Sequence, residues 1–157
     1  MKDSAVIANF TNIRVATHKL VADYGPEHLL IVPPGASNNI LWNFGHIITD
    51  GAEMLYQSNN LESPIPEEFR PLFLEKTSPA DWKSTPDIKQ VLDASQAFTD
   101  AITQNYASGV FAEFDPKSVD SAWPLNSIEK AIAYHTVHEA LHMGYIMALN
   151  RIISDQP

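Results

Sequence analysis

Four long stretches of the chain repeat apolar residues at helical spacing, and this pattern limits the fold more than any other feature. They span roughly residues 4–24, 37–57, 85–109 and 126–153. Within each stretch, apolar side chains recur three or four positions apart, which places them on one face of an α-helix. Such a helix has to bury its apolar face against a neighbouring element. The four stretches therefore predict an all-α fold.

The connections between these helices differ in length, which indicates how the helices are joined. Residues 58–85 contain Pro64, Pro66, Pro71 and Pro79. This segment is predicted as a long crossover with one short helix within 66–75. A second irregular link covers 109–125, in which 110–114 is predicted as a short extended piece. Four helices with a long crossover between the second and third indicate a four-helix bundle, as a single domain over 1–157.

Helix ends and internal glycines add local detail. Thr85 is predicted as the N-cap of the third helix, because a proline follows it at the first helical position. Asn126 has Glu129 three residues on, close to a capping box, and is predicted to open the fourth helix. Gly45 and Gly51 lie inside the second helix, where each costs about 1 kcal/mol relative to alanine. Both glycines are expected where a neighbouring element comes close.

Two of the helices have apolar stripes that we can assign residue by residue. For the first helix the predicted stripe is Val6, Phe10, Ile13, Thr17, Leu20 and Tyr24. For the fourth it is Ile128, Ile132, His135, His142, Ile146, Leu149 and Ile153. The stripe of the fourth helix places histidines on or beside the core, where water is scarce.

Composition excludes several classes of function. The net charge is -9 with histidines neutral, so a basic face for nucleic acid is not expected. There are no cysteines, which excludes disulfides, thiolate metal ligands and a cysteine nucleophile. Neither a secretory signal nor an apolar run of about 18 residues is visible, so no membrane span is expected and the predicted location is cytoplasmic.

Three of the six histidines lie within eight residues of the fourth helix, at His135, His138 and His142. His138 and His142 are four positions apart, so on a helix they lie one turn apart on the same face. That spacing lets two imidazoles bind one metal ion. A core histidine held by hydrogen bonds is the alternative interpretation. Three histidines on one stripe favour metal, because each buried ring needs partners for both nitrogens.

The segment from His138 to His142 also matches the H-E-x-x-H pattern of zinc proteases. A third ligand for such a protease would have to follow, but no glutamate is present in 143–157. The longer metzincin pattern needs glycine and histidine where this chain has Tyr145 and Ala148. A zinc endopeptidase is therefore the least favoured function.

The third ligand is more simply sought upstream, among His18, His28 and His46. His46 lies in the second helix, and a neighbouring bundle helix can place it opposite the pair on the fourth helix. His18 and His28 are interpreted as ordinary surface or packing residues.

Two motifs resemble those of a known family, the DinB-like (DinB/YfiT) four-helix-bundle superfamily. The run from Asn39 to His46 resembles its W-x-x-x-H motif on the second helix. His138-x-x-x-His142-x-Gly144 resembles its H-x-x-x-H-x-G-Q motif on the fourth. The resemblance covers nearly the whole chain and implies a divalent metal held by His46, His138 and His142, with water at the open positions. One departure is Tyr145, which stands where the family often has glutamine.

The resemblance also implies a class of function. Similar members include thiol-dependent S-transferases and isomerases that use low-molecular-weight thiols such as bacillithiol or mycothiol, and the bundles often form homodimers. The leading hypothesis is a metal-dependent thiol transferase or hydrolase that acts on a small molecule. The alternative is a non-catalytic, stress-related bundle with a structural metal. Zinc and nickel are the favoured metals, and iron and manganese are further candidates.

Five other residues are candidates for supporting or pocket roles. Glu139 would be the general base of a protease, but is interpreted here as a solvated or supporting carboxylate. Glu53 and Asp50 compete as carboxylates that orient a ligand histidine. His135 is expected mainly to pack, with ligand support as an alternative. Tyr145 is expected to line the pocket or the core.

Overall fold

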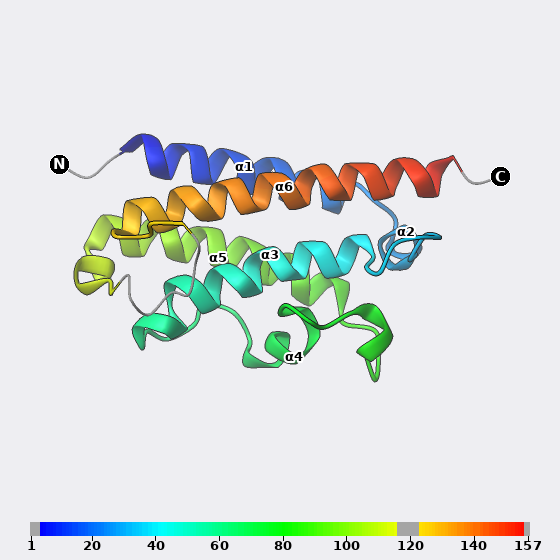
Figure 1. Ribbon diagram of the computed structural model, residues 1–157, viewed down its shortest axis with the longest axis horizontal. Coiled ribbons are helices and arrows are strands. Elements are labelled where there is room, and N and C mark those ends of the chain that lie inside the picture. The colour runs from blue at the N-terminus through cyan, green and yellow to red at the C-terminus, as the bar shows by residue number, and fades with distance from the viewer. Residues whose placement is uncertain (1–3, 116–122, 156–157) are drawn as a thin grey trace.

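The computed structural model describes residues 4–115 and 123–155, and it is built around four long helices (Figure 1). These are α1 (Ser4–Ala22), α3 (Ile40–Leu55), α5 (Ile88–Ser108) and α6 (Ile128–Ser154). No β-strand occurs in this part of the chain, so the predicted all-α bundle is confirmed. None of the described helices combines the length and the apolar character that crossing a membrane requires.

Shorter helices fill the connections. They are α2 (Pro26–Leu30), η1 (Gln57–Asn59), η2 (Glu67–Phe69), α4 (Arg70–Phe73), η3 (Pro79–Asp81) and η4 (Val110–Glu113). The short helix predicted within 66–75 corresponds to η2 and α4. The extended piece predicted at 110–114 is wrong, because η4 is a 3₁₀ helix there. Gly109 turns the chain with φ 85° just before it, and Phe111 packs edge-on against Tyr56 with ring centroids 5.3 Å apart.

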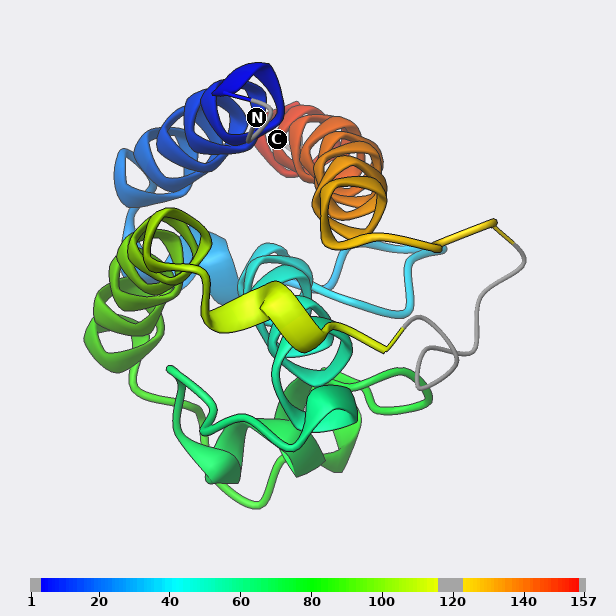
Figure 2. The same cartoon turned by 90° about the vertical axis from the view of Figure 1, so that its left-hand side faces the viewer.

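The directions of the long helices explain the long crossover. α1 and α6 run in one direction, and α3 and α5 run in the other (Figure 1). Seen along the bundle, α6 packs beside both α1 and α3, and α5 completes the ring (Figure 2). Because α3 and α5 are parallel, the chain has to return along the whole bundle between them. The crossover that carries α4 makes this return.

Two helix starts differ from the prediction by one or two residues. Asp87, not Thr85, caps α5, since its side chain accepts a hydrogen bond from the Gln90 backbone N–H at 3.1 Å. Ser127, not Asn126, caps α6. The side chain of Glu129 is 3.2 Å from the Tyr106 hydroxyl, which donates to it.

α3 is the most deeply buried helix of the bundle. Fourteen of its sixteen residues are buried, including Asn43 and His46. A helix that is apolar on all sides belongs inside a protein. Here α5, α6 and the crossover together enclose it, and polar side chains on α3 are thereby held away from bulk water.

Gly45 and Gly51 lie at close contacts, as the sequence predicted. A Cβ atom on Gly45 would lie 2.5 Å from the Phe73 ring, and one on Gly51 would lie 2.5 Å from Phe98 and 2.6 Å from His135. Gly144, in α6, has no such neighbour within 4 Å. The first two glycines are therefore needed for packing, whereas the third is not.

This contrast gives a matched pair of substitutions. Gly45→Ala is expected to lower the free energy of unfolding by about 1–3 kcal/mol, because the methyl group overlaps the Phe73 ring. Gly144→Ala is expected to raise it by up to about 1 kcal/mol, because alanine is the better helix former. Urea unfolding followed by circular dichroism measures both. Equal stability of the two variants would contradict the close packing at Gly45.

Candidate metal centre

Three histidines from two helices meet in the middle of the bundle. His46 comes from α3, and His138 and His142 come from successive turns of α6. One ligand atom from each lies within 4.8 Å of the others, so the three can hold one metal ion. The neighbouring packing of α3 and α6 brings them together, although the first is 92 or more positions from the other two. We call these three side chains the histidine triad.

Two of the three outer nitrogens of the triad contact hydrogen-bond acceptors, and the third lies near a carboxylate. The Nδ1 of His46 lies 2.7 Å from the backbone carbonyl oxygen of Phe73, and the Nδ1 of His142 lies 2.9 Å from the side-chain oxygen of Asn43. The Nδ1 of His138 lies 3.6 Å from a carboxylate oxygen of Asp50. An oxygen acceptor places the proton on Nδ1, which leaves Nε2 with a free lone pair. The contacts of His46 and His142 therefore favour this tautomer, whereas the Nδ1 of His138 has no hydrogen-bond partner.

The inner nitrogens of His138 and His142 lie within hydrogen-bonding distance of each other. The Nε2 atoms of His138 and His142 are 3.1 Å apart. Without a metal, a proton on the Nε2 of His138 can bridge the two rings as a hydrogen bond, and a metal ion can take the place of that proton. Two nitrogens bound at about 2.0–2.1 Å to one Zn²⁺ ion are separated by roughly this much. The donor set thus fits a divalent metal that prefers nitrogen ligands.

Burial disfavours the charged form of His138 and His142. The pKa of His142 is lowered to about 3, first by burial and then by the neighbouring His138 and His46. Burial also lowers the pKa of His138, while Asp50 acts in the opposite sense. Neutral imidazoles are the form that binds metal. At neutral pH, His138 and His142 therefore do not have to lose a proton before they bind a metal.

These lowered pKa values predict how stability depends on pH. In metal-free protein, the free energy of unfolding is expected to fall as the pH drops below about 6.5. His142 then takes up a proton in the unfolded chain, but not at its buried position in the folded protein. His135 and His138, whose pKa values are also lowered, add to the effect. Glu139 has the opposite effect on this pH dependence. Burial raises the pKa of its carboxyl, so the folded protein takes up that proton more readily than the unfolded chain does.

Urea unfolding of chelator-treated protein at about pH 7.5 and about pH 5 measures this loss. His142→Asn should make the loss smaller, because it removes a histidine whose pKa is lowered to about 3 in the folded protein. His28→Asn is the control, since His28 lies in α2 and bonds to Asn150 outside the triad. An equal loss in wild type and His142→Asn would contradict the prediction.

Asn43 is a supporting residue that the sequence analysis did not single out. Its side-chain nitrogen donates to the backbone oxygen of Asn39 at 2.8 Å, which turns its oxygen toward His142. The amide is thus fixed at both ends. One signal was available in the sequence, because Asn43 lies three residues before His46 and shares its side of the helix.

Replacing Asn43 tests this support. Asn43→Leu is expected to weaken metal binding about 10- to 100-fold, because His142 loses the acceptor that orients its ring. Asn43→Asp keeps an oxygen acceptor and should recover most of the affinity. Competition with a coloured chelator gives both values. Wild-type affinity in the leucine variant would rule out a supporting role.

The other predicted residues are spread over different surroundings. Asp50 lies beside His138, as described. Glu53 instead forms an ion pair with Arg70 at 3.2 Å, away from the triad. Tyr145 is 43 % exposed and lines a hollow next to His142.

His135 does not join the triad. It is 1 % exposed, and neither ring nitrogen has a hydrogen-bond partner. The ring lies among Phe10, Phe98 and the backbone of Gly51. Its ring centroid is 6.2 Å from that of His138. The surroundings are those of a packing residue.

Glu139 points away from the triad into a buried polar cluster. Its carboxylate oxygen accepts a hydrogen bond from the Arg14 guanidinium at 2.9 Å, and neither side chain is exposed to solvent. Arg14 also donates to the side chains of Thr99 and Ser95 on α5. Glu139 is therefore neither solvated nor a support for the histidines. Arg14 is fully buried although the stripe predicted for α1 contains the neighbouring Ile13 instead.

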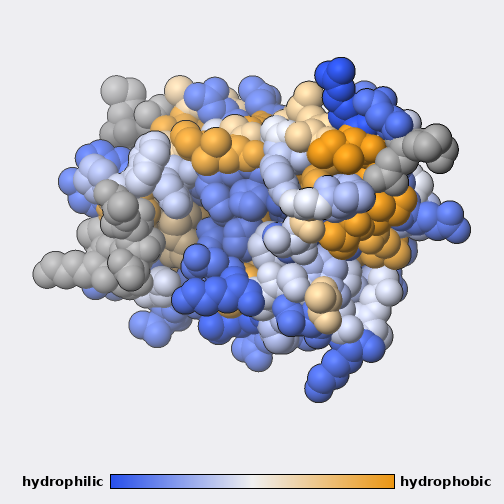
Figure 3. Space-filling view, turned by 45° about the vertical axis from the view of Figure 1, so that its right-hand side comes forward, coloured by the Kyte–Doolittle hydropathy of each residue, from blue (hydrophilic) through white to orange (hydrophobic). Residues whose placement is uncertain are grey.

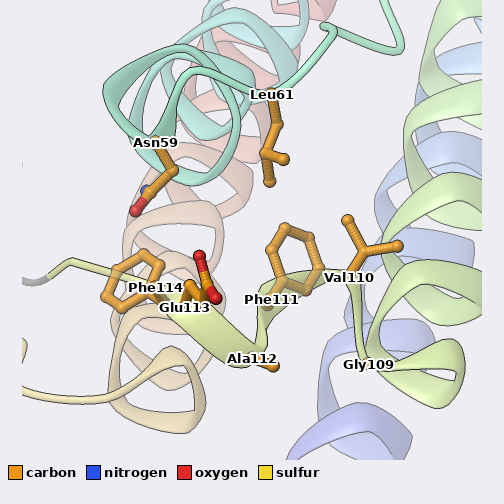
Figure 4. Close-up of a pocket in the computed structure, with 8 residues that line it drawn as sticks. All are labelled: Asn59, Leu61, Gly109, Val110, Phe111, Ala112, Glu113 and Phe114. Atoms are coloured by element: carbon orange, nitrogen blue, oxygen red, sulfur yellow. The ribbon is translucent and has the colours of Figure 1, made fainter.

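Two hollows on the surface differ in their relation to the triad. One, of about 390 Å³, is lined by His142 and Tyr145 among others, and opens beside the triad. Another, of about 330 Å³, lies between the end of α3 and η4, with Leu61 and Phe111 on its walls (Figure 4). No triad histidine lines the second hollow. Only the first gives a small molecule access to a candidate metal ligand.

The sequence model of the DinB superfamily matches residues 9–146, which is most of the chain and includes all three triad histidines. No curated protein matches the chain.

Proposed function

The chain belongs to the DinB superfamily, and from this premise we propose that it is a metal-dependent enzyme that acts on a small molecule. The reaction class proposed is thiol S-transfer or hydrolysis. The ion is held by His46, His138 and His142, and zinc or nickel is the first choice because imidazole nitrogen suits both.

The observation that carries this proposal is the convergence of three histidine nitrogens, from α3 and α6, within 4.8 Å of one another. The Nε2 atoms of His138 and His142 are 3.1 Å apart, while their Nδ1 atoms are turned toward Asp50 and Asn43. Together with His46, these two rings can offer three nitrogen ligands to a single metal ion.

The number of ligands supports catalysis over a purely structural role. Within the described residues, the group that can share one ion contains three histidines and no carboxylate. Structural zinc sites are usually closed by four protein ligands, whereas catalytic sites keep a position open. When bound, an ion of this kind lowers the pKa of a coordinated water or thiol and so supplies a nucleophile at neutral pH.

The chain's own residues hold and shield the site. The indole of Trp42 stacks on the His46 ring with centroids 4.8 Å apart and planes inclined by 7°, which covers one face of that ligand. Phe73, on the crossover, fixes the same ring through its carbonyl oxygen. His142 borders the open hollow. Substrate therefore approaches from the His142 side, while the His46 side stays closed.

The buried position of Glu139 weighs against a peptidase. A general base has to reach the water or proton that it activates. Glu139 is fully buried and paired with Arg14. The H-E-x-x-H motif is present, but its glutamate is not placed to act as the general base that the protease mechanism needs.

A turnover screen tests the proposal. Zinc- and nickel-loaded protein is offered 4-nitrophenyl acetate for hydrolysis, and cysteamine with 1-chloro-2,4-dinitrobenzene for thiol transfer. In the second reaction the sulfur replaces chloride, and the thiol proton is released. Metal-dependent turnover that is absent in chelated protein and in His138→Ala is expected. No turnover above these controls would overturn the enzyme proposal.

A spectroscopic experiment separates the enzyme from a structural site. Cobalt-substituted protein is titrated with cysteamine, and its visible absorption is followed. A change in the spectrum indicates an open position on the metal, as the enzyme requires. A spectrum that does not respond would favour the non-catalytic bundle with a closed site.

A further inference from the structure

The outer face of α6 is apolar over most of its length. Between Lys130 and Arg151, a stretch that the structure describes in full, the only acidic residue is Glu139, which is buried. Figure 3 shows apolar side chains gathered along the upper part of the molecule, where α1 and α6 lie in Figure 1. A contiguous exposed apolar face usually marks an interaction surface. Five large apolar side chains on α6 are 42–69 % exposed, namely Val137, Leu141, Tyr145, Met147 and Ile152.

Part of this face has the spacing of a helix-pairing seam. Five exposed residues follow one another at steps of three or four positions, which places them along one side of the helix. Apolar residues that repeat in this way let two helices pack along their length. We call these residues the α6 stripe, and they are Val137, Leu141, Gly144, Ala148 and Ile152.

The α6 stripe is complementary to itself when two copies run antiparallel. Leu141 and Ala148 lie at equal distances on either side of a point next to Gly144, and so do Val137 and Ile152. A two-fold axis at that point puts Leu141 of one copy opposite Ala148 of the other, a large side chain against a small one. Val137 then meets Ile152. At the centre, Gly144 adds no side chain that would hold the helices apart.

Charge also favours a second copy as the occupant of this face. The chain carries a net charge of -9, so an approach that brings acidic surfaces together is unfavourable. The α6 stripe contains no acidic residue, and two copies can therefore meet there without like charges directly opposite each other. The same net charge opposes binding to an anionic lipid surface. A basic partner would find no acidic side chain on the stripe to pair with.

We propose that the α6 stripe binds the α6 stripe of a second copy in antiparallel orientation, with Leu141 of each copy against Ala148 of the other. Leu141 also lines the hollow beside His142. The second copy therefore lies at the edge of that hollow, and two chains together define its mouth. This inference concerns a surface and holds whether or not the metal site is catalytic.

Sedimentation velocity tests the pairing with two matched variants. Ile152→Glu places a charge in the α6 stripe without touching the hollow, which Ile152 does not line. Val15→Glu makes the same kind of change on α1, where Val15 is 57 % exposed and lies near Gln96 and Thr99 of α5. Wild type and Val15→Glu are expected at twice the chain mass of 17.4 kDa, and Ile152→Glu at the single mass. Circular dichroism establishes that each variant is folded.

Introduced cysteines test the orientation, because the chain has none of its own. In the antiparallel pair Val137→Cys meets Ile152→Cys of the other copy, whereas two Ile152→Cys residues lie about 22 Å apart along the helices. A disulfide needs Cα atoms within about 7 Å of each other. Oxidation of the two variants with diamide should link them mainly when they are mixed. Leu141→Cys mixed with Ala148→Cys should also become linked, which places the second copy at the hollow.

Each result supports or overturns the proposal without reference to metal or turnover. A dimer that is lost only in Ile152→Glu, with selective linking in both mixtures, supports it. Wild type at the single mass overturns it, and flotation of that monomer with phosphatidylcholine vesicles would assign the face to lipid. A dimer that persists in Ile152→Glu, or that is lost equally in Val15→Glu, overturns the assignment to α6. Ile152→Cys that links to itself as readily as in the mixture overturns the antiparallel orientation.

Discussion

Replacing His46 by alanine is expected to remove the metal from the protein, and His138→Ala and His142→Ala are expected to do the same. The three inner nitrogens lie within 4.8 Å of one another and converge on a single position. Losing one of three ligands should cost more than the about 10- to 100-fold that follows from losing a supporting hydrogen bond. Untagged protein should therefore contain close to one metal ion per chain in wild type, and almost none in the variants.

The measurement is metal per chain by mass spectrometry, before and after reconstitution with zinc or nickel. His28→Ala is the control, because His28 bonds to Asn150 and takes no part in the triad. Circular dichroism establishes that each variant is folded. Metal that is lost with His138→Ala but kept with His46→Ala would assign the third ligand to another residue. No metal in wild type after reconstitution would leave the triad as packing alone.

The periodicity of the sequence predicted the four long helices well, because each buries a broad apolar stripe. The starts of α5 and α6 were less predictable. Asp87 and Ser127 compete as caps with neighbours that have equally suitable side chains, and the sequence does not rank them. The relative direction of α3 and α5 can be inferred from the length of the crossover. Two neighbouring helices that run parallel need a connection that returns along the bundle.

The triad was predictable for a different reason. His138 and His142 follow from helical spacing, and His46 from its place on a neighbouring helix together with the family motif. The atoms that orient the rings could not be read in the same way. The acceptor for His46 is a backbone oxygen at Phe73, 27 positions away, which leaves no signature in residue type.

Arg14 is a core residue that a search for apolar residues at helical spacing does not find. The predicted stripe of α1 used Ile13 and Leu20, whereas the fully buried positions are Phe10, Arg14, Thr17 and Val21. The buried residues of α1 have the same helical spacing as the predicted ones. They include a charged residue, however, which a search for apolar residues leaves out. An arginine is tolerated there because Glu139, 125 positions later, supplies the opposite charge. An ion pair between two residues so far apart in the sequence can be recognised only in the folded structure.

Removing the charge of Glu139 is expected to destabilise the protein by about 3–5 kcal/mol, because it leaves the Arg14 guanidinium buried without a counter-charge. Both side chains are 0 % exposed and meet at 2.9 Å between α1 and α6. Glu139→Gln is the direct test, with the free energy of unfolding measured in urea. Arg151→Gln is the matched control, since Arg151 and Asp155 form an ion pair on the surface. That substitution should cost about 0.5 kcal/mol or less.

The double variant Arg14→Met with Glu139→Leu distinguishes an ion pair from simple packing. Replacing both buried charges by apolar side chains is often neutral or stabilising, so the double variant should recover most of the stability that Glu139→Gln loses. A double variant as unstable as Glu139→Gln would contradict the ion-pair explanation. The metal supplies a second readout. Folded Glu139→Gln should keep its metal, because the carboxylate does not contact the triad. A stable variant that loses turnover but not metal would instead return Glu139 to the role of general base.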